Sequence, residues 1–307
     1  MNGKSFSAST GPSGADSSAQ DLGVLVGFDG SENAALALDY AADEAHRRNV
    51  VLTVVTVYTI PVRFYANLAS MPAHPDAVTA REEALEILDA ARGRLADYVG
   101  EIVYRAEAGH AVGVLAELTE SARVLVVGMR GRGGFLGHVL GSVAVAIPAH
   151  ASCPTIVVGD QPVPHGPVTA AVDGSDASQG VLAEAADVAS SRGAVLDVVM
   201  VLPPSDYVFV WYPEAAVDSD VVEARRMGLE ERLRDRVVPL REDFPDLTIE
   251  TTVAMGPPRP LLADRTAGSQ LTVMGTHGRG AVMSTLLGSV SRSVLHHSHA
   301  PIMVVPA

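Results

Sequence analysis

Two glycine-rich stretches with the same internal spacing constrain this chain more than any other feature. Each reads Gly-x-x-Gly, then nine residues, then Gly-Ser-Val. The shared positions are Gly128, Gly131, Gly141, Ser142 and Val143 in the first copy, and Gly275, Gly278, Gly288, Ser289 and Val290 in the second. Each copy follows a short apolar run and precedes a predicted helix. Because glycine lets a ligand approach the backbone, and a helix start presents unpaired N–H groups to an anion, the pattern predicts two phosphate sites.

The rest of the chain repeats together with these loops. The turn Asp29-Gly30-Ser31 recurs as Asp173-Gly174-Ser175, displaced by 144 residues, and the glycine stretches are displaced by 147. The repeat predicts two domains, at residues 21–160 and 168–307, joined by a proline-rich linker at 161–167. Residues 1–20 are rich in serine, glycine and alanine, so we expect a disordered leader there.

Within each half, apolar runs alternate with amphipathic segments. In the first half we expect strands at residues 22–28, 50–57, 101–106, 123–127 and 155–158, helices at 34–48, 76–99, 111–121 and from Ser142, and a long loop at 59–75. Strands that alternate with helices pair in parallel through right-handed crossovers. The prediction is an α/β fold made of two tandem open five-stranded parallel sheets, each doubly wound and Rossmann-like.

Three conspicuous positions of the first half fall at the same edge of the predicted sheet. Asp29, Val57 and Gly128 all lie at or near the carboxyl end of a predicted strand. Ligands of open α/β sheets bind outside the carboxyl ends of the strands, where the strand order reverses. We therefore expect these positions to converge on one crevice.

Charge and cysteine content narrow the range of partners. A formal net charge of -14 disfavours binding to nucleic acid or an anionic membrane. An anionic ligand must then be held by local N–H groups and a few arginines. The single cysteine, Cys153, suits a reducing compartment, and no apolar run approaches the ~18 residues of a membrane span. We expect a cytoplasmic protein with no nucleic-acid or membrane partner.

These residues resemble the universal stress protein family in its tandem form, with two domains in one chain. Both glycine stretches satisfy the nucleotide-binding signature of that family, G-2x-G-9x-G-[S/T], and the resemblance covers essentially everything after residue 20. It implies the strand order 3-2-1-4-5 in each half and one ATP per half, hence two per chain. Whether Mg²⁺ accompanies the nucleotide is left open.

The resemblance also implies roles for single residues. Asp29 and Asp173 would lie by the adenosine, and Val57 and Val201 would meet the adenine through their backbone. The signature glycines would approach ribose and phosphates, and each Gly-Ser-Val group would cradle the phosphates. The candidate set is completed by Gly27, Arg132, Gly133, Ala171, Arg279 and Gly280, of which the two arginines would screen phosphate charge.

Two points of the site are left open. An aspartate before Gly-Ser is a common turn, so helix capping alone is an alternative role for Asp29 and Asp173. In addition, Met129-Arg130 in the first loop replaces the Thr276-His277 pair of the second. The first loop is therefore expected to hold its ligand differently.

Two classes of function are compatible with these features. The first is a non-catalytic, ATP-binding regulator of a stress response that acts through an unknown protein partner. The second is an enzyme, either a slow ATPase or an ATP-dependent transferase of a related α/β fold. A sensor of another adenine nucleotide, such as cyclic AMP, is a further alternative. Because there is no G-x-x-x-x-G-K-[ST] loop and no two-carboxylate metal site facing the phosphates, we predict no catalytic residues, no metal site and no strong catalysis.

The fifth strand of each half predicts how the halves meet. Residues 155–158 and 302–305 are short and wholly apolar, and in the family's strand order each forms a sheet edge. A bare apolar edge invites pairing with another strand, and the short linker favours a partner in the same chain. We predict that the two strands lie antiparallel within one chain, giving a monomer with a pseudo-two-fold axis; a homodimer is the alternative.

Overall fold

The structure is a computed structural model of the whole chain. It describes residues 21–60, 75–132, 140–161, 163–203, 219–278 and 287–307. The predicted leader at residues 1–20 and most of the predicted loop at 59–75 lie outside these ranges. The exact domain boundaries, 21–160 and 168–307, stay predictions.

The first half alternates strands and helices in the expected order. Its elements are β1 (Gly23–Gly27), α1 (Glu32–Arg48), β2 (Leu52–Tyr58), α2 (Pro75–Arg94), β3 (Ile102–Ala108), α3 (Ala111–Thr119), β4 (Ala122–Gly128), α4 (Ser142–Ala146) and β5 (Thr155–Val158). Helix α2 ends five residues earlier than predicted, after Gly93, a poor helix former, enters its last turn. Helix α4 is short because Pro148, which has no N–H group, falls in the 3₁₀ turn that follows it.

The second half repeats this order. Its elements are β6 (Val168–Val172), α5 (Ser178–Ser191), β7 (Leu196–Leu202), α7 (Ser219–Asp243), β8 (Ile249–Met255), α8 (Pro258–Thr266), β9 (Leu271–Gly275), α9 (Ser289–His297) and β10 (Ile302–Val305). Helix α7 is longer than its counterpart α2, so part of the length difference between the halves lies in this helix.

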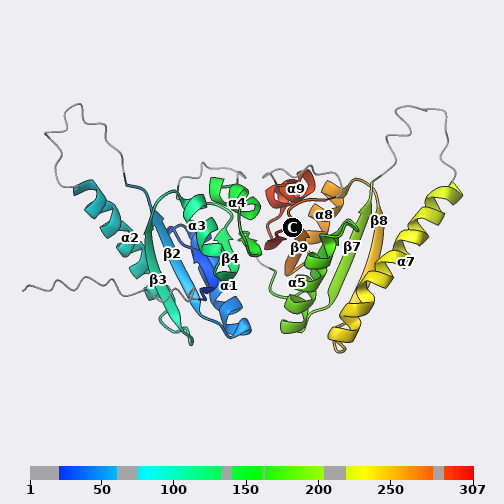
Figure 1. Cartoon of the computed structure of the whole chain (residues 1–307), viewed down its shortest axis with the longest axis horizontal. Helices are drawn as coiled ribbons and strands as arrows, with labels where there is room; N and C mark the ends of the chain where they lie inside the picture. The colour runs from blue at the N-terminus through cyan, green and yellow to red at the C-terminus, as the bar shows by residue number, and fades with distance from the viewer. Residues whose placement is uncertain (1–20, 61–74, 133–139, 162, 204–218, 279–286) are drawn as a thin grey trace, which may run out of the picture.

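All ten strands form one sheet, in the order β3-β2-β1-β4-β5-β10-β9-β6-β7-β8 (Figure 1). Each half has the predicted order 3-2-1-4-5 and parallel pairing. The halves join through β5 and β10, which pair antiparallel with Ile156 opposite Met303. The fold class and the antiparallel seam are thus confirmed, and the two predicted sheets are continuous with each other.

Helices cover both faces of the sheet, and each face has its own apolar core. Helices α1, α2, α5 and α7 pack on one face, where Leu38, Leu88, Leu182 and Leu233 are almost fully buried. Helices α3, α4, α8 and α9 pack on the other. Both cores run across the seam between the halves, so the halves are held together by apolar packing as well as by strand pairing.

A partly buried group of charged and polar side chains joins α1 to α5 across the same seam. We call Tyr40, Glu44, Arg48, Glu184 and Arg192 the seam cluster. Arg192 donates to the carboxylate of Glu44 at 2.9 Å and to the Tyr40 hydroxyl at 2.6 Å, and Arg48 donates to Glu184 at 2.9 Å. Glu44 is only 1% exposed; burial alone would raise its pKa, but Arg192 and Arg48 lower it to about 2. Glu44 is therefore ionised at neutral pH and pairs with the cationic Arg192 and Arg48.

Candidate functional site

The first candidate site is a pocket at the carboxyl ends of β1, β2 and β4, with a volume of about 750 Å³. This is the edge at which open α/β sheets bind their ligands. All the residues predicted for this half that the structure describes line the pocket: Gly27, Asp29, Val57, Gly128, Gly131, Arg132, Gly141, Ser142 and Val143. Gly133 lies outside the described residues. The convergence expected from the sequence is therefore observed.

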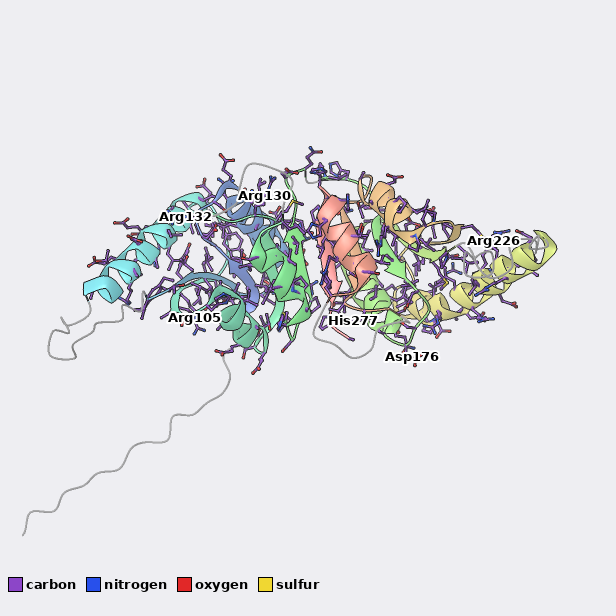
Figure 2. The ribbon with its side chains drawn as sticks, turned by 90° about the horizontal axis from the view of Figure 1, so that it is seen from above. Arg105, Arg130, Arg132, Asp176, Arg226 and His277 are labelled. Carbon is purple, nitrogen blue, oxygen red and sulfur yellow. The ribbon has the colours of Figure 1, made fainter. Side chains whose placement is uncertain are left out.

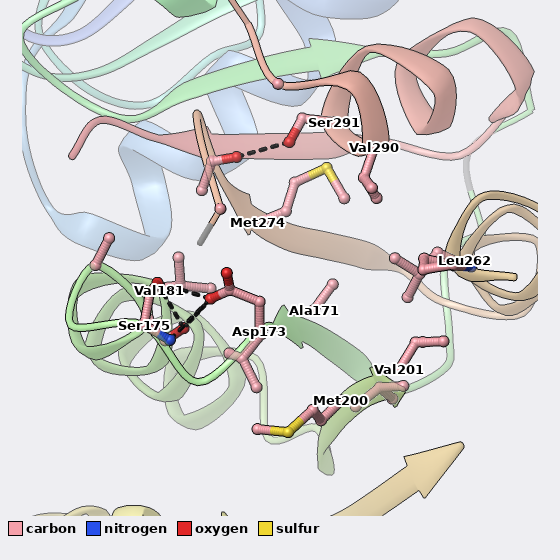
Figure 3. A pocket seen from close by; sticks show the side chains of 18 of the residues that line it. Ala171, Asp173, Ser175, Val181, Met200, Val201, Leu262, Met274, Val290 and Ser291 are labelled. Carbon is pink, nitrogen blue, oxygen red and sulfur yellow. Dashed lines mark hydrogen bonds between the residues drawn. The ribbon is translucent and has the colours of Figure 1, made fainter. Parts of the chain in front are cut away.

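The second candidate site is the equivalent pocket of the other half, with a volume of about 680 Å³ (Figure 3). Its wall includes the predicted residues Ala171, Asp173, Val201, Gly275, Gly278, Gly288, Ser289 and Val290. Arg279 and Gly280 lie outside the described residues. The pocket walls show where these residues lie and not what they bind, so the ligand contacts of all of them remain predictions.

In the first half, Asp29 ties the end of β1 to the glycine loop. Its Oδ1 accepts a hydrogen bond from the N–H of Ser31 at 3.0 Å, and its Oδ2 accepts one from the N–H of Arg132 at 2.9 Å. The N-cap of α1 is Ser31, whose hydroxyl accepts from the N–H of Ala34 at 3.2 Å. Asp29 is therefore not the N-cap of α1: it holds Arg132 and the turn beside it at the pocket wall.

In the second half, the same Asp-Gly-Ser turn is held differently. The Oδ1 of Asp173 accepts from the hydroxyls of Ser175 at 2.6 Å and Ser178 at 3.0 Å, and α5 begins only at Ser178. From α7, Arg236 donates to the carbonyl oxygens of Gly174 at 2.9 Å and Ser175 at 2.8 Å. The turn that borders the second pocket is thus clamped by a neighbouring helix.

The third glycine of each signature closes its own loop. The N–H of Gly141 donates to Met129 O at 2.9 Å, and the N–H of Gly288 donates to Thr276 O at 2.8 Å. These two N–H groups therefore already have an acceptor inside their own loop. The donors that the helix starts leave for a ligand come from the residues after the glycine, beginning with Ser142 and Ser289.

The first glycine of each signature has a different neighbour in each half. A methyl group on Gly128 would come within 2.6 Å of the carbonyl oxygen of Asn33 and 3.0 Å of the nitrogen of Ala34. At Gly275 the nearest atom would be 3.4 Å away, an ordinary contact. Gly128 is therefore required by the packing of α1 against β4, a reason that the sequence did not reveal.

Among the described residues, which leave out Arg279, the two pockets also differ in their charged side chains. Arg130 and Arg132 line the first pocket. The second has His277 at the position equivalent to Arg130, and α7 adds Arg225. Figure 2 shows Arg130 and His277 near the middle of the molecule, on opposite sides of the seam, as a pseudo-two-fold axis through the seam requires. Sequence reasoning missed Arg225, since nothing in the pattern of α7 distinguishes a pocket-lining arginine from its exposed neighbours.

The described residues offer little for metal or thiol chemistry. Among them, no group of three or more His, Cys, Asp or Glu side chains could hold a metal ion. Cys153 is buried, and burial raises the pKa of its thiol to about 12, so the reactive thiolate is not formed at neutral pH. In the described part of the chain, no helix has both the length and the apolar character needed to cross a membrane.

The chain is similar to known proteins over most of its length. The sequence model of the universal stress protein family matches residues 23–159 and 165–306. Universal stress protein Rv1996 of Mycobacterium tuberculosis is 33% identical over 312 residues, which cover 92% of this chain and 95% of that protein. Universal stress protein Rv2005c of the same organism is 33% identical over 298 residues, covering 92% and 96%. The crystal structure of a universal stress protein from Archaeoglobus fulgidus has the same fold, with a TM-score of 0.64 at 22% identity and coverage of 94% and 99%.

Proposed function

This chain belongs to the universal stress protein family, and on that premise we propose that it is a nucleotide-dependent regulator of a stress response. Each half binds one adenine nucleotide, ATP in the first instance, so that one chain carries two. The bound nucleotide alters the surface that an as yet unknown protein partner recognises. The proposal places the protein in the cytoplasm, in keeping with its single buried cysteine.

One observation carries this proposal. In both halves, every predicted signature residue that the structure describes lines a single pocket at the carboxyl edge of the sheet. The cavities, of about 750 and 680 Å³, lie within the ~300–1,000 Å³ that small-molecule sites occupy. Each combines an apolar wall with glycine backbone and a helix start, which suits a ligand with an aromatic base at one end and an anion at the other.

The described pocket walls also favour binding over catalysis. The one carboxylate in each wall is Asp29 or Asp173, and both already accept hydrogen bonds from their own turns. The only lysine of the whole chain is Lys4, so neither glycine loop contains the lysine that reaches the phosphates in phosphoryl-transfer enzymes. We therefore propose weak or no catalysis. A slow ATPase, an ATP-dependent transferase and a sensor of cyclic AMP stay as alternatives.

The test uses a matched pair of charge substitutions, Ser142→Glu and Ser289→Glu. Both serines are exposed first residues of a helix, where an acidic residue favours the helix dipole and should not harm the fold. A carboxylate there repels bound phosphates by about 4 kcal/mol at ~4 Å and an effective dielectric constant of about 20. The neutral controls are Ser142→Gln and Ser289→Gln.

Calorimetric titration with ATP should give two sites in the wild type, one in each single Glu variant and none in the double variant. The Gln variants lose the hydroxyl but keep the backbone N–H groups and add no charge, so they should weaken each site far less than the Glu variants do. A wild-type stoichiometry of one, or no heat with ATP, ADP, AMP or cyclic AMP, would contradict the proposal. Mass spectrometry of nucleotide released from freshly purified protein identifies the natural ligand. A steady ATPase rate near the ~10 s⁻¹ median of enzymes, lost in the double Glu variant, would favour the enzyme alternative.

A further inference from the structure

One carboxylate connects the wall of the first pocket to the second half of the chain. Asp160 lies two residues after the end of β5. Its Oδ2 accepts a hydrogen bond from Nη2 of Arg130 at 2.8 Å. Its other oxygen, Oδ1, lies 2.8 Å from Nδ1 of His299, just before β10. Arg130 is a pocket residue of the first loop, whereas His299 belongs to the second half. The two oxygens of Asp160 therefore bridge a predicted ligand site and the seam.

The backbone around this bridge is fixed, so the ion pair has a defined geometry. A methyl group on Gly159 would lie 1.9 Å from the carbonyl oxygen of His299, so only glycine lets the two chain segments approach this closely. The N–H of Gln161 donates to that same oxygen at 3.1 Å. The hydrogen bond from His299 lowers the pKa of Asp160, with a further contribution from Arg130, so the carboxylate is charged at neutral pH.

The ion pair is partly shielded from water. The side chain of Arg130 is 24% exposed and that of Asp160 is 33% exposed. Salt screens a partly buried pair less than an open surface pair, so Asp160 acts on Arg130 with appreciable force. In a chain with a net charge of -14, a positive side chain in a pocket wall is a scarce means of holding an anion.

The sequence of the second half does not repeat the side chains of this bridge. At the displacement of 147 residues, Arg130 corresponds to His277, Asp160 to Ala307 and His299 to Ser152. Neither Ala307 nor Ser152 can supply a carboxylate or an imidazole side chain. Any effect that acts through Asp160 should therefore appear at the first site alone.

We propose that Asp160 is a positioning residue that restrains Arg130 and thereby lowers the affinity of the first site for phosphate groups. The inference rests on the proposed function, because it concerns the nucleotide site of the first half. The guanidinium of Arg130 shares its charge between Asp160 and any phosphate that enters the pocket.

The experiment compares Asp160→Asn with the wild type, both carrying Ser289→Glu so that only the first site is measured. Titrations with adenosine, AMP and ATP separate the contribution of phosphate from that of the base. Asp160→Asn should tighten ATP binding about fivefold, which corresponds to the energy of a partly exposed ion pair. It should tighten adenosine binding by less than about twofold. AMP should fall between them. Asp160→Ser serves as a second variant, and thermal unfolding of each variant shows that the fold is retained.

A double-mutant cycle with Arg130→Gln separates positioning from a general effect of charge. If Asp160 acts through Arg130, the gain from Asp160→Asn should largely vanish in the Arg130→Gln background. An undiminished gain there, an equal gain for adenosine and ATP, or weaker ATP binding in both Asp160 variants would overturn the inference. Failure of the proposed function looks different, because the wild type would then bind no adenine nucleotide at either site.

Discussion

The two halves share the turn Asp-Gly-Ser but hold it in different ways. In the first half Ser31 caps α1 at once and Asp29 reaches across to the N–H of Arg132. In the second half, the hydroxyl of Ser175 donates to Asp173 and caps no helix, α5 starts later, and Arg236 of α7 clamps the turn from outside. The residue equivalent to Arg132, Arg279, lies outside the described residues. The same three residues thus enter different hydrogen-bond networks, because the neighbouring helices differ.

The seam shows the same kind of asymmetry. At a displacement of 144 residues, Arg48 corresponds to Arg192, but buried Glu44 corresponds to Val188. Each arginine crosses the seam, Arg48 to Glu184 and Arg192 to Glu44. Only the Glu44 side of this arrangement is almost fully buried. The two halves therefore share the same backbone arrangement, but only the first half carries the buried carboxylate, that of Glu44.

Of the changes considered, Glu44→Gln should lower the free energy of unfolding the most. The change leaves Arg192, whose side chain is only 7% exposed, without its buried carboxylate, and we expect a loss of about 3 kcal/mol in unfolding free energy. The matched variant Glu184→Gln breaks a more exposed ion pair and should lose less than about 1 kcal/mol. Urea unfolding followed by circular dichroism measures both. Equal losses would show that the seam is energetically symmetric.

The pH dependence of the same pair provides a second measurement. Because the pKa of Glu44 is lowered to about 2 in the folded chain, its contribution to stability is present above the ordinary value near 4.5 and is lost as the pH falls towards 2. The difference in stability between the wild type and Glu44→Gln should therefore shrink across this range. A difference that stayed constant down to pH 2 would show that the charge of Glu44 is not what stabilises the seam.

The next largest difference in stability between the halves is expected when the first signature glycine is replaced by alanine. Gly128→Ala places a methyl group 2.6 Å from the backbone of α1, so we expect a loss of about 2 kcal/mol, typical of overpacking. At Gly275 the nearest contact would be 3.4 Å, so Gly275→Ala should change stability by less than about 0.5 kcal/mol. Thermal unfolding of the two variants checks the difference. Two equally stable variants would mean that α1 moves aside without strain.

The sequence predicted those features that depend on local pattern and on the repeat. Alternating strands and helices gave the parallel α/β fold, and the resemblance to the family implied the strand order within each half. The apolar fifth strands predicted an antiparallel seam, in which Ile156 is found opposite Met303. The spacing of glycines also led to the positions that line each pocket. These features survive the differences between the halves because they rest on backbone geometry.

Side-chain contacts between distant segments could not be predicted in the same way. The packing of Gly128 against Asn33 and the bond from Asp160 to Arg130 depend on how closely two separate elements approach. Arg236 lies on a helix with many other arginines, and only the fold shows that it reaches the turn at Gly174. Such contacts are where the two halves diverge, since a repeat in sequence does not specify them.

The smallest expected effect concerns the turn itself. Ser31→Ala removes the N-cap of α1 and should lower stability by about 1 kcal/mol, the usual value for a serine cap. Ser175→Ala removes no cap, since α5 begins at Ser178, and Asp173 keeps its bonds from the N–H of residue 175 and from the Ser178 hydroxyl. We expect that change to lose about 0.5 kcal/mol or less.

Hydrogen exchange distinguishes these two variants better than global unfolding does. The N–H of Ala34 loses its acceptor in Ser31→Ala, so it should exchange faster together with the first turn of α1. In Ser175→Ala the start of α5 should keep its exchange rate, because Arg236 still binds the carbonyl oxygens of Gly174 and residue 175. Faster exchange at both helix starts would mean that the serine hydroxyl does the same work in each turn. The clamp from α7 would then be an addition to the cap rather than its replacement.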